Sequence, residues 1–304
     1  MSEQTLTRPP SQFLEVDGRP VHWVDFGGPA GKPDAPMAVC VHGLGGSWVN
    51  WMALAPLLTS RYHVVALDLA GFGLTEAEGR RSDIRSNRRL LDAFLGTITD
   101  KPVTLIGNSM GGLLSILEAA RHPEMVERLV LLDAAVPLPR NRFPNDPRFV
   151  ATFLTMATPI AGEQILKRRN RRTPPADLIG ETLNLVCHDP SRVNPALIRE
   201  SEAMAAVRAG TRGNEKAFLA AARSIAGVLA RPRRYIEAIM DIKQPTLLLF
   251  GERDRLVPVA AGRAVAARRP DWTFVVHSDL GHVPQIEDPA WTAEQILGWA
   301  AENG

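Results

Sequence analysis

The stretch Val103-Thr-Leu-Ile-Gly-Asn-Ser-Met-Gly-Gly-Leu-Leu114 is the clearest indication of the fold class. A short apolar run, Val103–Ile106, leads directly into a Gly-x-Ser-x-Gly turn, and a helical pattern follows over Leu113–Arg121. In this strand–turn–helix context the serine sits on a strained turn that pushes its hydroxyl out at the strand end. Glycines two residues to either side let the neighbouring backbone pass close. The stretch therefore predicts an α/β sheet with Ser109 as a candidate nucleophile at its edge.

Outward from this stretch, runs rich in Val, Leu and Ile alternate with helical patterns, which favours a mostly parallel sheet flanked by helices. Asp17-Gly18, between the first two runs, predicts a hairpin. Asp288 as N-cap and Pro289 as first helical residue predict the start of the last helix. Eight strands are expected, at Gln12–Val16, Pro20–Phe26, Met37–Val41, His63–Asp68, Val103–Ile106, Arg128–Leu132, Thr246–Phe250 and Trp272–His277. Helices are expected at Trp48–Leu58, Asp83–Leu95, Leu113–Arg121, Val259–Arg268 and Ala290–Ala301.

The alternation stops after Leu132, and no strand-like run appears again until Pro245. Such a segment is too long for a plain loop. We therefore expect residues 137–241 to fold as a helical cap, inserted into an α/β core made of residues 1–136 and 242–304. Residues 140–240 contain 17 basic and 9 acidic residues, whereas the remainder contains 18 and 24. The basic stretches of the cap are either solvated helix faces or attractors of an anionic substrate or an acidic surface.

A serine hydroxyl needs a base to become a good nucleophile, and the base needs an acid that orients it. Folds with this kind of elbow place the acid and then the histidine after the serine along the chain. His282 follows the last predicted strand within five residues and is the predicted base. His277 belongs to that strand and is the weaker candidate.

The predicted acid is Asp254, which lies just past the strand Thr246–Phe250. Asp133 competes with it, because it ends the strand before the insertion. Glu252 and Asp279 are close in sequence but less well placed.

Attack on an ester carbonyl creates an oxyanion, which two backbone N–H groups should bind. One is expected from Met110, the residue after the candidate nucleophile. The other is expected from Leu44, in the glycine-rich turn that follows Met37–Val41. His42 is interpreted as a brace for that turn.

Several classes of function are disfavoured. No phosphate-binding glycine motif stands at a strand–helix junction, so a nucleotide site is not expected. The two cysteines, Cys40 and Cys187, form no metal motif or disulfide framework, and the predicted chemistry needs no cofactor and no metal. The net charge of +2 and the absence of a binding module argue against nucleic acid. A polar N-terminus and the lack of a long apolar run predict a cytoplasmic protein without stable membrane insertion. The oligomeric state is left open.

The chain resembles the α/β-hydrolase superfamily over nearly its whole length. The resemblance rests on five motifs in order: His42-Gly-Leu-Gly45, Asp68-x-x-Gly-x-Gly73, Gly107-Asn-Ser-Met-Gly111, Gly251-x-x-Asp254 and Gly281-His282. Within it, the Asn-Ser-Met-Gly-Gly elbow looks like small capped bacterial carboxylesterases and lipases. It also looks like the C–C bond hydrolases of aromatic degradation. Those usually have a Gly-Gly-Gly-Pro-Gly turn and a tryptophan after the catalytic histidine, where this chain has Gly43-Leu-Gly-Gly-Ser47 and Val283.

This resemblance implies a serine hydrolase that cleaves carboxylic esters of hydrophobic small molecules through an acyl-enzyme. A C–C bond, lactone or thioester hydrolase on the same triad is the alternative, and a non-catalytic ligand receptor is the third reading. A serine at position 109, where dehalogenases and epoxide hydrolases need aspartate, disfavours those activities. Apolar residues of the cap are expected to pack its core or line the substrate pocket, among them Phe143, Phe149, Phe153, Leu183, Met204 and Phe218.

Overall fold

An eight-stranded sheet forms the centre of the computed structural model, which describes residues 6–139, 161–211 and 213–303. The strand order is β1-β2-β4-β3-β5-β6-β7-β8. Strand β2 runs antiparallel to β1 and β4, and the remaining neighbours pair in parallel. The strands are β1 (Ser11–Val16), β2 (Arg19–Gly27), β3 (Met37–Val41), β4 (His63–Leu67), β5 (Val103–Asn108), β6 (Val126–Leu132), β7 (Thr246–Gly251) and β8 (Thr273–His277). The mostly parallel sheet and all eight predicted strands are confirmed.

The predicted hairpin at Asp17-Gly18 and the predicted helix start at Asp288-Pro289 are confirmed. Asp17 and Gly18 both have positive φ, at 53° and 71°, which is the conformation that the mirror-image hairpin turn requires. Asp288 caps the last helix by accepting a hydrogen bond from the Trp291 N–H, and Pro289 is its first residue.

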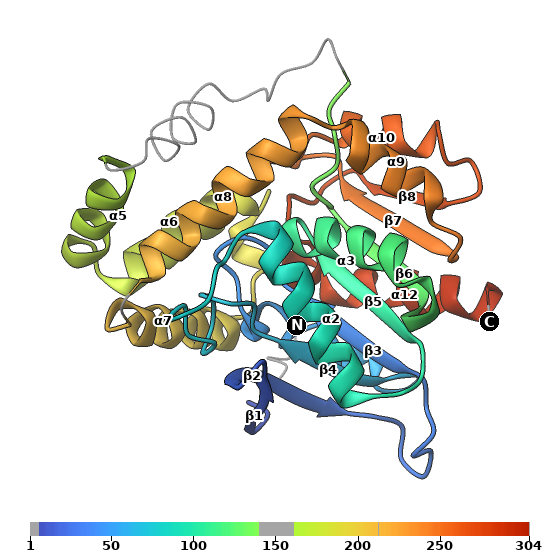
Figure 1. The fold of residues 1–304 in the computed structure, drawn as a ribbon, viewed down its shortest axis with the longest axis horizontal. Coiled ribbons are helices and arrows are strands. Elements are labelled where there is room, and N and C mark those ends of the chain that lie inside the picture. The colour runs from blue at the N-terminus through green and yellow to red at the C-terminus, as the bar shows by residue number, and fades with distance from the viewer. Residues whose placement is uncertain (1–5, 140–160, 212, 304) are drawn as a thin grey trace.

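Helices cover both faces of the sheet (Figure 1). Strand β6 shows why, because its side chains alternate between the two apolar clusters: Leu129 and Leu131 point to one, Val130 and Leu132 to the other. The first cluster contains residues of α2 (Ile84–Ile98), α3 (Met110–Arg121), α9 (Arg233–Asp241) and α10 (Val259–Ala266). The second contains residues of η1 (Trp48–Trp51), α1 (Ala55–Leu58), α11 (Pro284–Glu287) and α12 (Pro289–Glu302). A short 3₁₀ helix, η2 (Pro123–Met125), leads into β6.

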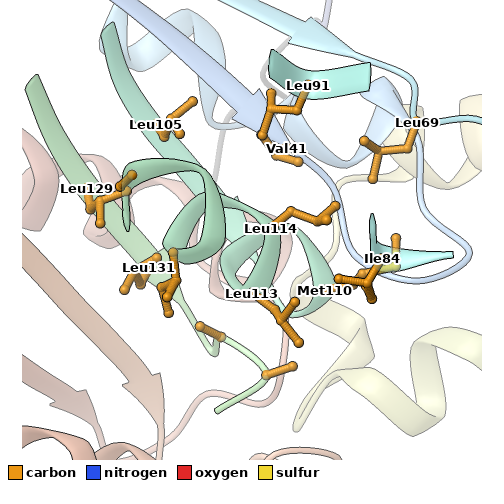
Figure 2. Packing of buried hydrophobic residues seen from close by; sticks show 14 of the residues in the cluster. Val41, Leu69, Ile84, Leu91, Leu105, Met110, Leu113, Leu114, Leu129 and Leu131 are labelled. Carbon is orange, nitrogen blue, oxygen red and sulfur yellow. The ribbon is translucent and has the colours of Figure 1, made fainter. Parts of the chain in front are cut away.

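Helix α3 is held in the first cluster by its apolar face. Figure 2 shows Leu113 and Leu114 of this helix beside β5 and β6, together with Met110 at the helix start. These three side chains are fully buried. The core packing therefore fixes the position of the turn that precedes the helix.

The helix predicted over Trp48–Leu58 is wrong, because the segment is divided into η1 and α1. Ser47 and Asn50 form a capping box around the short η1 turn. Pro56 then stands in the first turn of α1, where its missing N–H costs nothing. A proline inside one continuous helix would have broken that helix at this point.

The insertion between β6 and β7 is helical in its described part. It comprises α5 (Ala161–Arg172), α6 (Pro175–Val186), η3 (Pro190–Arg192), α7 (Pro195–Ala209) and α8 (Asn214–Ala230). In Figure 1 these helices lie to one side of the sheet. Helix α9 instead packs on α3, and Tyr235 donates a hydrogen bond of 3.1 Å to the carbonyl oxygen of Ala135. Within the described ranges, no helix is long and apolar enough to cross a membrane.

Candidate active site

Ser109 occupies a strained turn between β5 and α3. Its φ of 55° and ψ of −115° lie in a region that non-glycine residues rarely adopt. A Cβ atom on Gly111 would lie 1.9 Å from the carbonyl oxygen of Val41, and one on Gly107 would lie 2.6 Å from the Gly111 backbone. The two glycines of the motif are therefore required for the backbone crossing that exposes Ser109.

The turn is tied to its neighbours through Asn108. The Asn108 side-chain amide donates to the carbonyl oxygens of Leu132 and His282, both at 3.0 Å. The Ser109 N–H also donates to Leu132, at 3.0 Å. One buried amide thus joins the elbow to the loop that contains His282, which lies 174 positions further along the chain.

His282 and Asp254 form a buried pair. The Nδ1 atom of His282 lies 2.7 Å from Oδ2 of Asp254, and the residues are only 4% and 8% exposed. Oδ1 of Asp254 accepts hydrogen bonds from the N–H groups of Leu256, at 2.7 Å, and Val257, at 3.0 Å. These backbone donors hold the carboxylate in place, and its contact with Nδ1 sets the orientation of the imidazole ring. Nε2 is then the ring nitrogen on the side away from Asp254.

The structure brings Ser109 to the same end of the sheet, but in the described residues its hydroxyl makes no hydrogen bond to His282. In ligand-free sites the bond between nucleophile and base is often long and tightens only when substrate binds. Ser109 itself is half-buried, so it is more accessible than the histidine–aspartate pair.

The glycine-rich turn after β3 lies beside Ser109. A Cβ atom on Gly43 would lie 3.2 Å from Cβ of Ser109. Gly46 N–H donates to the Gly43 carbonyl at 3.1 Å, which leaves Leu44 and Gly45 as the central residues of the turn. Met110 is the first residue of α3, so its N–H has no carbonyl partner within the helix. The two predicted oxyanion donors therefore belong to the two backbone segments that adjoin Ser109.

His42 has the bracing contacts that the sequence predicts. Its Nδ1 lies 2.7 Å from the Gly43 carbonyl oxygen, and its Nε2 accepts from the Leu69 N–H at 3.1 Å. The ring is fully buried, and burial lowers the pKa of His42, with the nearby Asp68 opposing the shift. Both ring nitrogens are therefore engaged by the backbone of this turn and of the segment after β4.

Asp133, the competing acid, lies next to the pair without replacing Asp254. It has a φ of 44°, is fully buried, and accepts a hydrogen bond of 3.0 Å from the Gly251 N–H. Burial raises the pKa of Asp133 well above its usual range, and the neighbouring charge of Asp254 raises it further. Asp133 therefore holds its proton more strongly than an exposed carboxyl group does.

The weaker candidates have other partners. His277 accepts a hydrogen bond from the Asp279 N–H at 3.1 Å and its ring packs on Trp291. Glu252 forms an ion pair with Arg263 at 2.5 Å. The His282 ring instead has Asp254 as its carboxylate partner.

Two groups of potential metal ligands occur in the described residues. One is Asp133, Asp254 and His282, in which the His282–Asp254 hydrogen bond already uses both partners. The other is Asp92, Glu118 and His122, where Arg88 lies 2.7 Å from Glu118 and supplies a positive charge in place of a cation. We propose no metal at either group.

Part of the insertion reaches the site. A Cβ atom on Gly45 would lie 3.2 Å from the ring of Phe218 on α8, so this helix covers the glycine-rich turn. Leu183 and Met204, which were expected to pack the cap's core or to line the pocket, are buried at 9% and 8% exposure in the second apolar cluster, together with residues of η1. The expected contributions of Phe143, Phe149 and Phe153 lie outside the described residues.

A serine on a strained elbow, close to a buried histidine–aspartate pair at the end of a parallel sheet, defines the α/β-hydrolase class. The family model of the alpha/beta hydrolase fold matches residues 38–289, and the chain belongs to this family.

The chain is also similar to individual members over nearly its full length. It is 28% identical over 299 residues to the "Uncharacterized hydrolase YugF" of Bacillus subtilis, covering 94% of this chain and 96% of the relative. It is 28% identical over 292 residues to a 2-hydroxy-6-oxononadienedioate/2-hydroxy-6-oxononatrienedioate hydrolase of Paraburkholderia phymatum, covering 93% and 91%. Among solved structures, a membrane phospholipase A matches with a TM-score of 0.70 and 26% identity, covering 97% and 86%. A putative lipase of Acinetobacter baumannii matches with a TM-score of 0.75, covering 97% and 91%, and at 19% identity this likeness shows the fold alone.

Proposed function

We propose that the chain hydrolyses carboxylic esters of hydrophobic small molecules through an acyl-enzyme on Ser109. The observation that carries this proposal is the buried His282–Asp254 hydrogen bond of 2.7 Å, joined to the elbow by the Asn108 amide. This arrangement supplies a nucleophile, a base with its free nitrogen defined, and an acid that orients the base.

In this mechanism Ser109 attacks the ester carbonyl while Nε2 of His282 takes the hydroxyl proton. The backbone N–H groups of Leu44 and Met110 bind the oxyanion, and losing one such donor typically costs about 2.7–4 kcal/mol of transition-state stabilisation. His282 then gives the proton to the leaving alcohol, and a water molecule repeats the sequence on the acyl-enzyme. Asp254 stabilises the imidazolium in both halves of the reaction.

We further propose that residues 137–241 act as the cap that shapes the substrate pocket. Phe218 supports this, because it places an apolar ring of α8 against the glycine-rich turn beside Ser109. Apolar residues over the site would favour a hydrophobic acyl or alcohol group.

C–C bond hydrolysis is the second candidate. It is favoured by the similarity to the Paraburkholderia phymatum hydrolase, whose name gives a 2-hydroxy-6-oxo dienedioate as substrate. It is disfavoured by the turn Gly43-Leu-Gly-Gly-Ser47 and by Val283 after the histidine, which depart from the usual sequences of that group. The two candidates share the triad and differ in the substrate.

A substrate panel separates them. p-Nitrophenyl esters of graded acyl length and a 2-hydroxy-6-oxo dienedioate are offered to the wild type and to Ser109→Ala. We expect turnover of the esters by the wild type and its loss in the variant. Turnover of the dienedioate in preference to every ester would replace ester hydrolysis by the second candidate. Equal turnover by Ser109→Ala would overturn both.

A further inference from the structure

The end of helix α6 lies directly against the loop that contains His282. The His282 N–H donates to the Val186 carbonyl oxygen at 2.7 Å. A Cβ atom on Gly281 would lie 2.5 Å from that same oxygen and 2.6 Å from the backbone nitrogen of His188. The insertion and the histidine loop are therefore in backbone contact, and only glycine fits at position 281.

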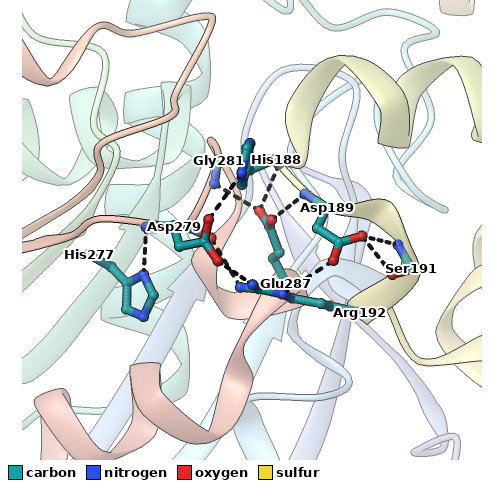
Figure 3. Close-up of polar contacts among 8 residues, drawn as sticks. All are labelled: His188, Asp189, Ser191, Arg192, His277, Asp279, Gly281 and Glu287. Atoms are coloured by element: carbon teal, nitrogen blue, oxygen red, sulfur yellow. Dashed lines mark hydrogen bonds and ion pairs between the residues drawn. The ribbon is translucent and has the colours of Figure 1, made fainter.

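A buried carboxylate fastens the two segments together. Glu287, on α11, is 2% exposed. Its Oε2 accepts hydrogen bonds from the N–H groups of Gly281, at 2.8 Å, and His188, at 3.1 Å, and its Oε1 accepts from Asp189 at 2.7 Å (Figure 3). Charge-assisted bonds to backbone N–H groups offset the cost of burying the carboxylate. One side chain thus bridges the insertion and the histidine loop.

An outer layer of ion pairs joins the same two segments. Arg192 pairs with Asp279 and with Asp189, and Nε2 of His188 lies 3.0 Å from Oδ1 of Asp279 (Figure 3). These groups are a third to nearly a half exposed, and exposed pairs contribute little. The buried Glu287 is therefore the main link.

Both backbone polar groups of His282 are consequently hydrogen-bonded. Its N–H is bound by Val186 of the insertion, and its carbonyl oxygen by Asn108 of the elbow. We infer that Glu287 is a positioning residue, which fastens residues 186–189 to the histidine loop and thereby sets the imidazole of His282 relative to Ser109. This inference rests on the proposed function, since it assigns His282 as the base.

The test compares Glu287→Gln with Glu294→Gln, a matched change on the exposed face of α12. The amide nitrogen of glutamine cannot accept a hydrogen bond, so one side of the bridge is lost. We measure the rate at which an alkyl fluorophosphonate labels Ser109, and the hydrogen exchange of the Gly281, His282 and His188 amides. Misplacement of a reacting group by about 1 Å can cost on the order of 100-fold in rate.

We expect Glu287→Gln to exchange these amides faster and to label 10- to 100-fold more slowly, with Glu294→Gln unchanged. Glu287→Asp keeps the carboxylate, so it should recover part of the rate and serves if the glutamine variant does not fold. Labelling of Glu287→Gln at the wild-type rate would overturn the inference, as would unchanged amide exchange. A wild type that is not labelled at all would overturn the proposed function instead, and the exchange data would still test the bridge.

Discussion

Replacing Asp133 with asparagine tests whether a neutral carboxyl lies beside the histidine–aspartate pair. Burial and the charge of Asp254 hold the pKa of Asp133 well above its usual range. We therefore expect the folded protein to keep the proton on this group across the assayed pH range. Asparagine is also neutral and has nearly the same shape. The substitution should therefore leave the charge around His282 unchanged.

If Asp133 were instead ionised, the effect of removing its charge could be estimated from the distances in the site. Asp133, Asp254 and His282 offer atoms that all lie within 4.8 Å of one another. At that separation and an effective dielectric constant of about 20, a negative charge on Asp133 would favour the imidazolium by about 3.5 kcal/mol. Removing it would then move the acid limb of the kcat/KM profile down by about 2.5 pH units.

The assay is the pH dependence of kcat/KM with the best p-nitrophenyl ester. Activity falls on the acid side because His282 must be unprotonated to accept the serine proton. We expect the acid limb of Asp133→Asn to coincide with that of the wild type. If the acid limb of Asp133→Asn lay a pH unit or more below that of the wild type, Asp133 would not be neutral in the folded protein. As a control, Asp254→Asn should lower kcat on the order of 10⁴-fold, because the imidazole loses the partner that fixes its tautomer.

Two further predictions concern stability. Gly111→Ala should lower the free energy of unfolding by about 1–3 kcal/mol or more, because the new methyl group would overlap the Val41 carbonyl oxygen at 1.9 Å. Gly298→Ala should raise the free energy of unfolding by about 0.5–1 kcal/mol, because a Cβ atom at this position of α12 has nothing within 4 Å. Equal urea midpoints for the two variants would contradict the close packing of Gly111 against Val41. Burial raises the pKa of Glu118 from 4.5 to about 7, against the opposing charge of Arg88. The folded-state pKa exceeds the unfolded value, so this contribution to stability is present below the unfolded pKa and is lost as pH rises through the folded one. Relative to Glu118→Gln, the wild type should lose about 3 kcal/mol across that window, and parallel stability–pH curves would argue against the shift.

Much of the fold follows from patterns that lie within a few residues of one another. The strand Val103–Ile106, its glycine-flanked serine and the apolar face of α3 are local signals, and the structure places them as expected. The eight strands follow from the same kind of pattern. The segment Trp48–Leu58 does not form one helix, because Pro56 fits the first turn of a new helix but not the interior of a continuous one.

The candidate site is only partly visible in the sequence. Asp254 and His282 are found from their positions after successive strands, and their hydrogen bond agrees with that choice. Glu287 was missed, because its partners His188 and Asp189 lie 99 and 98 positions away. Contacts between segments so far apart depend on packing that no local pattern encodes. The one signal for Glu287 is an acidic residue in the short segment between the histidine and the start of α12.

Tandem mass spectrometry of the protein labelled with a fluorophosphonate identifies the modified residue, and so tests whether Ser109 is the nucleophile. A phosphonate reacts with an activated serine whatever the natural substrate, so the result does not depend on choosing the right ester. We expect one adduct, on Ser109, which is absent in Ser109→Ala and forms far more slowly in His282→Ala. An adduct on another residue, or labelling of Ser109→Ala at the wild-type rate, would contradict it.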